Sequence, residues 1–177
     1  MFITHFIGDI HQPLHASRSS DRGGNKIPAH FLQVNKENSK NLSYSISHHS
    51  ALNLHAVWDD SIIIEAIQMK YRKSRELLEQ DLYIFIIDQM TNHADEFEKT
   101  WLLCPDGSKK ECTTIWGDES LQNALEYAYR NVDGTEILSG TVLSQEYYIS
   151  RLPVVMESLA KAGLRLAITL DFALANG

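Results

Sequence analysis

The sequence lacks a basic tail and any stripe rich in Lys and Arg, and its formal net charge is −7, from 16 Lys and Arg against 23 Asp and Glu. Non-specific binding of duplex DNA through phosphate neutralisation is therefore excluded as the main function. The apolar runs at 62–64 and 82–87 are too short to cross a membrane, and no signal peptide is visible. The Glu-x-x-His pairs of di-iron helical bundles are also missing.

Cysteine is scarce. The two cysteines, Cys104 and Cys112, flank a polar stretch rich in turn-forming residues. A disulfide that closes this short loop is the favoured interpretation and would indicate an oxidising compartment; two unpaired thiols at a helix end are the alternative. Asn41-Leu42-Ser43 is a glycosylation sequon, a pattern that also arises often by chance.

The chain of 177 residues is 44% hydrophobic and contains no linker, repeat or low-complexity segment, so we expect a single helical domain over residues 1–177. Alternating apolar residues at 31–34 and 42–46 predict a small β-hairpin. The predicted fold class is mainly α with this hairpin as an insertion. Apolar periodicity predicts helices at 2–12 (ended by Pro13), 51–69, 72–101 (one or two helices), 116–130 and 144–175, with Pro153 in the first turn of the last one or at a kink.

Two His-x3-Asp pairs recur, His5 with Asp9 and His55 with Asp59, and His15 follows the first pair. On an α-helix, residues four apart point into the same space. Imidazole and carboxylate groups are ligands that zinc takes in hydrolytic sites. Both pairs lie among apolar residues, so we expect them to face the protein interior, where metal would compensate their buried charge. The pattern predicts a site for more than one metal ion.

The remaining histidines and several other polar residues are assigned supporting or ordinary structural roles. His11 lies off the face of His5 and Asp9, which favours a supporting role over ligation. Trp58 is expected to pack behind the metal. Glu119-Ser120 and Arg165 are compatible with bracing the ligand helices, but we favour a helix cap and a surface ion pair. Ordinary roles are expected for the histidines without a spacing partner, His30, His48, His49 and His93.

Three segments together resemble the zinc-dependent single-strand-specific nucleases, the class I nucleases that also act as 3′-nucleotidases and are related to zinc phospholipase C. The similarity runs over essentially the whole chain and implies a phospholipase C/nuclease-type helical domain. The segments are His5-Phe-Ile-Gly-Asp9-Ile-His-Gln-Pro-Leu-His15, Asp21-x-Gly-Gly-Asn25 and Asn53-Leu-His55-x-Val-Trp58-Asp59.

The resemblance implies up to three zinc ions in the full-length protein. Asp9 matches a catalytic carboxylate that bridges two close zinc ions, and His5 matches a ligand of that pair. The ligand set of the third zinc is matched by His15, His55 and Asp59. Gly24 and Asn25 match a substrate-binding loop. The N-terminal ligands of the family cannot be placed, so we expect the chain to be the C-terminal portion of a longer protein, whose N-terminal segment completes the site.

The implied activity is hydrolysis of single-stranded DNA and RNA to 5′-mononucleotides, together with removal of phosphate from 3′-nucleotides. The family, the disulfide and the sequon favour a secreted or extracytoplasmic protein without membrane insertion. Two alternatives stay open. One is a phospholipase C-type phosphodiesterase with the same metal chemistry. The other is a catalytically incomplete fragment that holds one structural zinc through His15, His55 and Asp59.

Overall fold

The structure is a computed structural model that describes residues 2–35, 43–46, 52–102 and 109–175. Its secondary structure is mainly helical, which confirms the predicted fold class. The helices are α1 (Phe2–Ile10), η1 (Pro13–Ala16), α2 (Leu54–Ala56), η2 (Val57–Ser61), α3 (Ile62–Met69), α4 (Arg75–Asn92), α5 (Ala94–Thr100), α6 (Lys109–Asn123), η3 (Ala124–Ala128) and α7 (Gln145–Ala175). The strands are β1 (Ala29–Asn35), β2 (Ser43–Ile46) and β3 (Thr141–Leu143).

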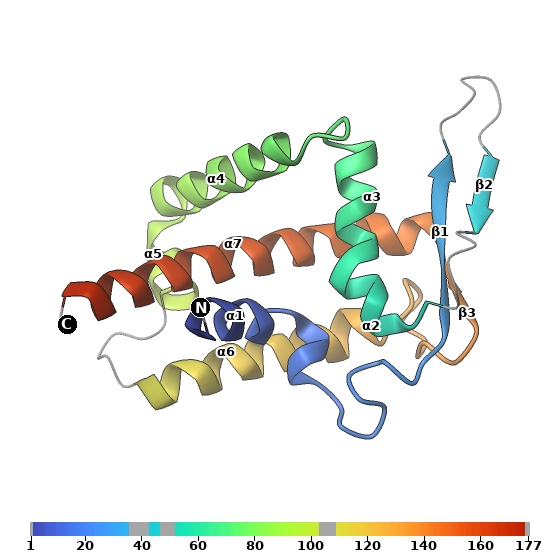
Figure 1. Cartoon of the computed structure of the whole chain (residues 1–177), viewed down its shortest axis with the longest axis horizontal. Helices are drawn as coiled ribbons and strands as arrows, with labels where there is room; N and C mark the ends of the chain where they lie inside the picture. Colours follow the sequence, from blue (N-terminus) through green and yellow to red (C-terminus); the bar gives the residue numbers. More distant parts are fainter. Residues whose placement is uncertain (1, 36–42, 47–51, 103–108, 176–177) are drawn as a thin grey trace.

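Helix α7 runs through the length of the molecule and organises the other helices around it (Figure 1). It contacts α1, α3 and α4, while α6 contacts α1 and η1. The sheet lies at the end of the molecule where α7 begins, and the N-terminus of the chain lies toward the opposite end (Figure 1). The segments with the predicted ligands, α1 to η1 and α2 to η2, are therefore held on a scaffold of longer helices.

The predicted hairpin is confirmed, and the sheet contains one strand more than predicted. Strands β1 and β2 pair antiparallel, with Leu32 opposite Ile46. Strand β3 pairs parallel with β1 on its other side, with Phe31 opposite Leu143. A strand of three residues has no measurable periodicity, and its partner lies more than 100 residues away in the sequence, so the pattern could not reveal it.

Most helix boundaries agree with the predictions. Residues 72–101 form two helices, α4 and α5, and Pro153 lies in the interior of α7, eight residues after Gln145, rather than in its first turn. The predicted start of a helix at Trp116 is wrong, because α6 already begins at Lys109. The first turns of α6 are polar and carry no apolar stripe, which is the signal that marks a helix in sequence.

The largest core cluster lies directly beneath the predicted ligands. Leu14 and Leu54, which precede His15 and His55, are 1% and 0% exposed. Trp58, which precedes Asp59, is 2% exposed and donates its indole N–H to the Tyr147 hydroxyl at 2.9 Å. Burial of each neighbouring apolar side chain fixes the direction in which the adjacent polar side chain leaves the core.

Two sequence predictions, the disulfide and the sequon, fall partly outside the described residues. Cys104 of the predicted disulfide and Asn41 and Leu42 of the sequon lie in the undescribed segments. Both features stay predictions. Among the helices that are described, none is sufficiently long and apolar to span a membrane.

Candidate metal centre

Helix α1 and the turn after it place Asp9 and His15 side by side. Pro13 cannot continue α1, and the chain turns into η1, where the side chain of Gln12 accepts the N–H of Leu14. This turn brings His15 Nδ1 to 3.5 Å from Asp9 Oδ1. The other oxygen of Asp9, Oδ2, lies 3.0 Å from His5 Nε2. Asp9 therefore stands between two imidazoles.

His15, His55 and Asp59 form the one group of three potential metal donors found among the described residues, and their donor atoms all lie within 4.8 Å of one another. Asp59 Oδ1 lies 3.2 Å from His15 Nε2, and Asp59 Oδ2 lies 3.3 Å from His55 Nε2. The two imidazole rings stack at 4.9 Å with an angle of 7° between their planes. Two imidazole nitrogens and one carboxylate are a donor set that suits zinc and leaves coordination positions open.

Hydrogen bonds fix the orientation of two of these donors. His55 Nδ1 lies 2.7 Å from the carbonyl oxygen of Gly23. Because a carbonyl only accepts, Nδ1 carries the proton, and the lone pair of Nε2 is left for a metal. Gln12 donates from Nε2 to Asp59 Oδ1 at 2.6 Å and so holds that carboxylate toward His15. Gln12 was not among the predicted site residues, although its place beside Pro13 within the first motif is a usable signal.

His55 and Asp59 lie where the helix changes its hydrogen-bond pattern. Asn53 caps α2 by accepting the N–H of Ala56 at 2.8 Å. Residues Val57–Ser61 then form a π-helical turn before α3 continues. Such turns are rare and occur frequently at functional sites. The sequence spacing predicted a plain α-helix here, and the four-residue separation still brings the two side chains together.

The loop at 17–26 supplies the carbonyl that orients His55. Asp21 Oδ1 accepts the N–H of Gly24 at 2.8 Å and the hydroxyl of Tyr129 at 3.0 Å. Gly23 has φ +61, and a Cβ there would lie 2.3 Å from the backbone oxygen of Leu14. Glycine is therefore required at 23 both for the backbone conformation and for the close approach.

The two residues predicted to bind substrate belong to this loop. Gly24 is buried, and its N–H is used by Asp21. Asn25 is exposed, and its Nδ2 donates to the carbonyl of Arg22 at 2.9 Å. These contacts give both residues a role in shaping the loop, and contact with substrate stays a prediction.

The expectation that His5 and Asp9 face the protein interior is wrong. Their side chains are 71% and 39% exposed. Of the apolar residues of α1 only Ile7 is buried, whereas Phe2 and Phe6 are 77% and 63% exposed. An apolar neighbourhood in sequence does not reveal which face of a helix is covered, and the charge of Asp9 consequently does not need a buried counter-ion.

The interpretation of Arg165 as part of a surface ion pair is also wrong, because Arg165 is 2% exposed. Its Nη1 lies 2.7 Å from Glu119 Oε2 and 2.8 Å from His11 Nε2. Its Nε and Nη2 donate to the carbonyls of Trp101 and Thr100, both at 3.0 Å. Arg165 thus joins α7, α6 and the end of α5 to the segment that carries Asp9.

The same network explains His11 and corrects the interpretation of Ser120. His11 Nδ1 donates to the carbonyl of Ile7 at 2.6 Å, and burial lowers the pKa of His11 to about 4, so its ring is neutral at neutral pH. The predicted supporting role of His11 agrees with these contacts. Ser120 lies inside α6 rather than at its start, and its hydroxyl donates to the carbonyl of Ile10. Sequence could not show this arrangement, because the partners of Arg165 lie more than 40 residues away.

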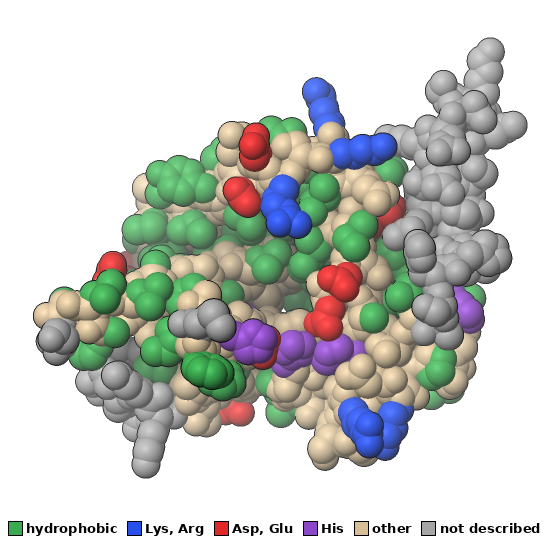
Figure 2. Space-filling view, viewed as in Figure 1, with side chains coloured by type: hydrophobic (Ala, Val, Ile, Leu, Met, Phe, Trp, Pro, Cys, Tyr) green, Lys and Arg blue, Asp and Glu red, His purple; other side chains and the backbone are tan. Residues whose placement is uncertain are grey.

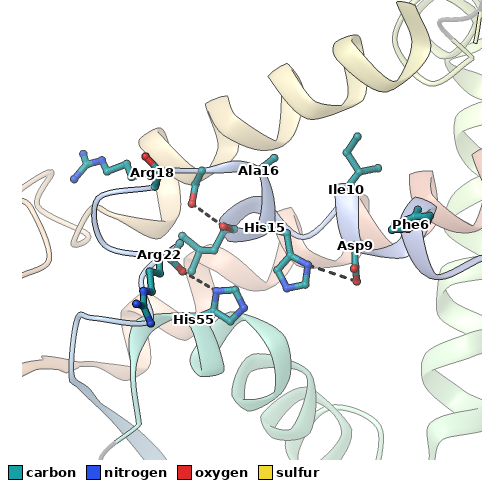
Figure 3. Close-up of a pocket in the computed structure, with 12 residues that line it drawn as sticks. Phe6, Asp9, Ile10, His15, Ala16, Arg18, Arg22 and His55 are labelled. Carbon is teal, nitrogen blue, oxygen red and sulfur yellow. Dashed lines mark hydrogen bonds and ion pairs between the residues drawn. The ribbon is translucent and has the colours of Figure 1, made fainter. Parts of the chain in front are cut away.

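Asp9, His15 and His55 line a pocket of about 680 Å³, with Phe6 and Arg22 on opposite sides of it (Figure 3). Asp59 lines a second pocket of about 210 Å³, together with Asp9, His15 and Trp58. On the face shown in Figure 2, histidine side chains form a row with carboxylates beside it. The site is therefore open to solvent and is large enough for a ligand of nucleotide size.

The cluster of imidazoles and carboxylates on this helical scaffold has the donor chemistry of a metal-binding site. The sequence model of the S1/P1 Nuclease family matches residues 1–175, and the chain belongs to this family. It is 37% identical over 171 residues to Endonuclease 3 of Arabidopsis thaliana, which covers 97% of this chain and 49% of that protein. Endonuclease 2 of the same plant is 37% identical over 180 residues, with 97% and 50% covered. Nuclease S1 of Aspergillus oryzae is 29% identical over 181 residues, with 96% and 52% covered. The chain thus spans about half the length of these relatives.

Proposed function

We propose that the protein containing this chain is a zinc-dependent nuclease that hydrolyses phosphodiester bonds in single-stranded DNA and RNA to 5′-mononucleotides and removes phosphate from 3′-nucleotides. The observation that carries the proposal is the convergence of His15, His55 and Asp59 beside Asp9 in an open pocket, in a member of the S1/P1 nuclease family. Substrate and products are inferred from the family.

His15, His55 and Asp59 would hold one zinc ion, and His5 and Asp9 would contribute to binding of further ions. Zinc, when bound, supplies positive charge that stabilises phosphate oxygens and makes water a better nucleophile at neutral pH. Gln12 and the carbonyl of Gly23 hold Asp59 and His55 in the orientation that binding requires. The pocket admits an unpaired nucleotide, whereas the stacked interior of a duplex would have to be opened first.

Turnover, rather than the stoichiometry of zinc, separates this proposal from that of an incomplete fragment. Three donors converge at His15, and a second group is limited to His5 and Asp9 among the described residues. Purified chain should therefore bind one zinc ion most tightly, as measured by metal analysis after dialysis. The proposal of catalysis requires chelator-sensitive release of acid-soluble nucleotides from single-stranded DNA, tested with the longest natural protein that contains these residues.

Adjacent carboxylates provide a matched pair of variants. Asp59→Asn should lower zinc affinity by about 100-fold, because it removes a direct ligand. Loss of a residue that only hydrogen-bonds to a ligand already lowers metal affinity by about 10–100-fold. Asp60→Asn should bind zinc like the wild type, because Asp60 is exposed and is outside the donor group. Hydrolysis that persists after complete removal of zinc would contradict the proposal. Hydrolysis of phosphatidylcholine in place of oligonucleotide would support the phospholipase C alternative.

A secreted or extracytoplasmic location accompanies this proposal. It is supported by the cysteine pair and the sequon at 41–43. Mass spectrometry of the protein from its native source, with and without reduction, would detect the Cys104–Cys112 bond and any glycan.

A further inference from the structure

The loop at 17–26 carries three cations, Arg18, Arg22 and Lys26, beside a metal centre in an otherwise acidic chain. Arg18 and Arg22 line the same pocket as Asp9, His15 and His55. Figure 2 shows Lys and Arg side chains gathered over this loop, below the row of histidines. In the close-up, Arg22 is on the same side of the pocket as His55, and Arg18 points away from His55 (Figure 3). The loop therefore places a cation at the edge of the metal centre.

The three cations differ in their availability for a ligand. Arg18 is 2.5 Å from Glu136 Oε1 and lies over the ring of Tyr129 at 4.2 Å. Lys26 donates from Nζ to the carbonyl of Ser20 at 3.1 Å. Arg22 is exposed, and in the part of the chain that the structure describes no carboxylate lies within ion-pair distance of its guanidinium. Arg22 is thus the cation of this loop that both lines the pocket and, among the described residues, has no carboxylate partner.

The backbone holds Arg22 in a fixed and unusual conformation. Its φ is +56, a left-handed value that favours glycine and costs an arginine about 1 kcal/mol or more. Its N–H donates to the carbonyl of Ser19 at 3.2 Å, and its own carbonyl accepts the side chain of Asn25 at 2.9 Å. The carbonyl of the next residue, Gly23, accepts a hydrogen bond from His55 Nδ1. The position of Arg22 is therefore coupled to that of a metal ligand, and strain of this kind gathers at functional sites.

We propose that Arg22 forms a second phosphate-binding subsite, which holds a phosphate next to the scissile one when a polynucleotide lies in the metal pocket. This inference rests on the proposed function. Guanidinium groups bind phosphate through paired, charge-assisted hydrogen bonds. A pocket of about 680 Å³ is larger than one nucleotide requires, so room remains for the next unit of the chain. Arg22 would therefore favour substrates with two or more phosphates over substrates with one.

The test compares a dinucleoside monophosphate, which offers only the scissile phosphate, with a trinucleoside diphosphate. In the wild type, kcat/KM should be higher for the substrate with two phosphates. Arg22→Gln should reduce this preference about 5–10-fold, through KM rather than kcat, and Arg22→Lys should restore part of it. For a longer oligonucleotide, a plot of log KM against the logarithm of the salt concentration should be less steep for Arg22→Gln than for the wild type, by about 0.7–1 in slope. The control is Lys70→Gln, which removes a cation that pairs with Asp81 at 2.7 Å on another part of the surface.

The outcomes distinguish this inference from the proposed function. An Arg22→Gln enzyme that keeps both the preference and the salt slope of the wild type overturns the subsite and leaves the nuclease proposal standing. If the wild type hydrolyses neither substrate, the nuclease proposal fails, and the subsite is decided by binding. In that case fluorescence anisotropy of labelled oligothymidylate, measured in EDTA, should show weaker binding by Arg22→Gln than by Lys70→Gln. Equal binding by the two variants would overturn it.

Discussion

Replacing Gly23 with alanine should damage both the stability and the metal affinity of the protein. The new Cβ would lie 2.3 Å from the Leu14 carbonyl oxygen and 3.4 Å from His55 Nδ1, on a backbone with φ +61. The left-handed conformation costs an L-residue about 1–2 kcal/mol. Forcing apart two packed backbone segments adds about 1–3 kcal/mol. We therefore expect Gly23→Ala to lower the free energy of unfolding by about 3 kcal/mol.

The effect on the metal follows from the same contacts. The Leu14 carbonyl also accepts the Ser17 hydroxyl at 2.7 Å and precedes His15, so its displacement moves one ligand directly. The Gly23 carbonyl orients His55, so rotation of that peptide disturbs a second ligand. Loss of such an orienting partner lowers metal affinity by about 10–100-fold.

Urea unfolding in EDTA measures the stability of Gly23→Ala without metal, and competition with a chromophoric chelator measures its zinc affinity. The matched control is Gly163→Ala in the interior of α7, where a Cβ meets no atom within 4 Å. This variant should gain about 0.5–1 kcal/mol from helix propensity and should bind zinc like the wild type. If Gly23→Ala matches the wild type in both measurements, the reasoning about this loop is refuted.

Three further variants test the contacts around the centre. Gln12→Ala removes the donor to Asp59 and should lower zinc affinity by about 10-fold in the same competition assay, and unchanged affinity would contradict an orienting role. Arg165→Met removes one of the two cations bound to Glu119 and the donor to the carbonyls of Thr100 and Trp101, and it should cost about 3 kcal/mol in urea unfolding, whereas a loss below about 1 kcal/mol would argue against the buried network. Although burial raises the pKa of Glu119, its bonds to Lys161 and Arg165 lower it below the ordinary 4.5. A carboxylate with a lowered folded-state pKa stabilises above its unfolded pKa and loses this effect as pH falls through the folded value. The wild type should therefore lose stability below about pH 4.5, and Glu119→Gln should lack this part of the loss in acid titrations followed by circular dichroism.

The sequence predicted those parts of the site that depend on local geometry. Residues four apart on a helical segment lie together whether the turn is α or π, so the pairs His5–Asp9 and His55–Asp59 could be read directly. The approach of His15 to Asp59 is different, because 44 residues separate them and only tertiary packing brings them to 3.2 Å. Spacing alone could not show it, and it was implied by the family resemblance.

The errors have a common physical origin. Periodicity shows that a side chain lies on a given face of a helix, but it does not show what covers that face. His5 was expected inside and lies exposed, while Arg165 was expected at the surface and lies buried. In both cases the outcome depends on neighbours distant in sequence, such as α6 and the end of α5 for Arg165. Burial of a charged side chain requires several partners together, and no single one of them has a signature in the sequence.

Asp9 gives the centre a further property, because each of its oxygens faces a different imidazole. Oδ1 lies 3.5 Å from His15 Nδ1, and Oδ2 lies 3.0 Å from His5 Nε2. If His15 binds a metal through Nε2, its Nδ1 carries the proton and faces Asp9, which is the arrangement that fixes the orientation of a ligating imidazole. A metal bound by His5 and Asp9 would draw on the same carboxylate. We therefore expect that zinc bound at one site would change the zinc affinity of the other through the carboxylate of Asp9.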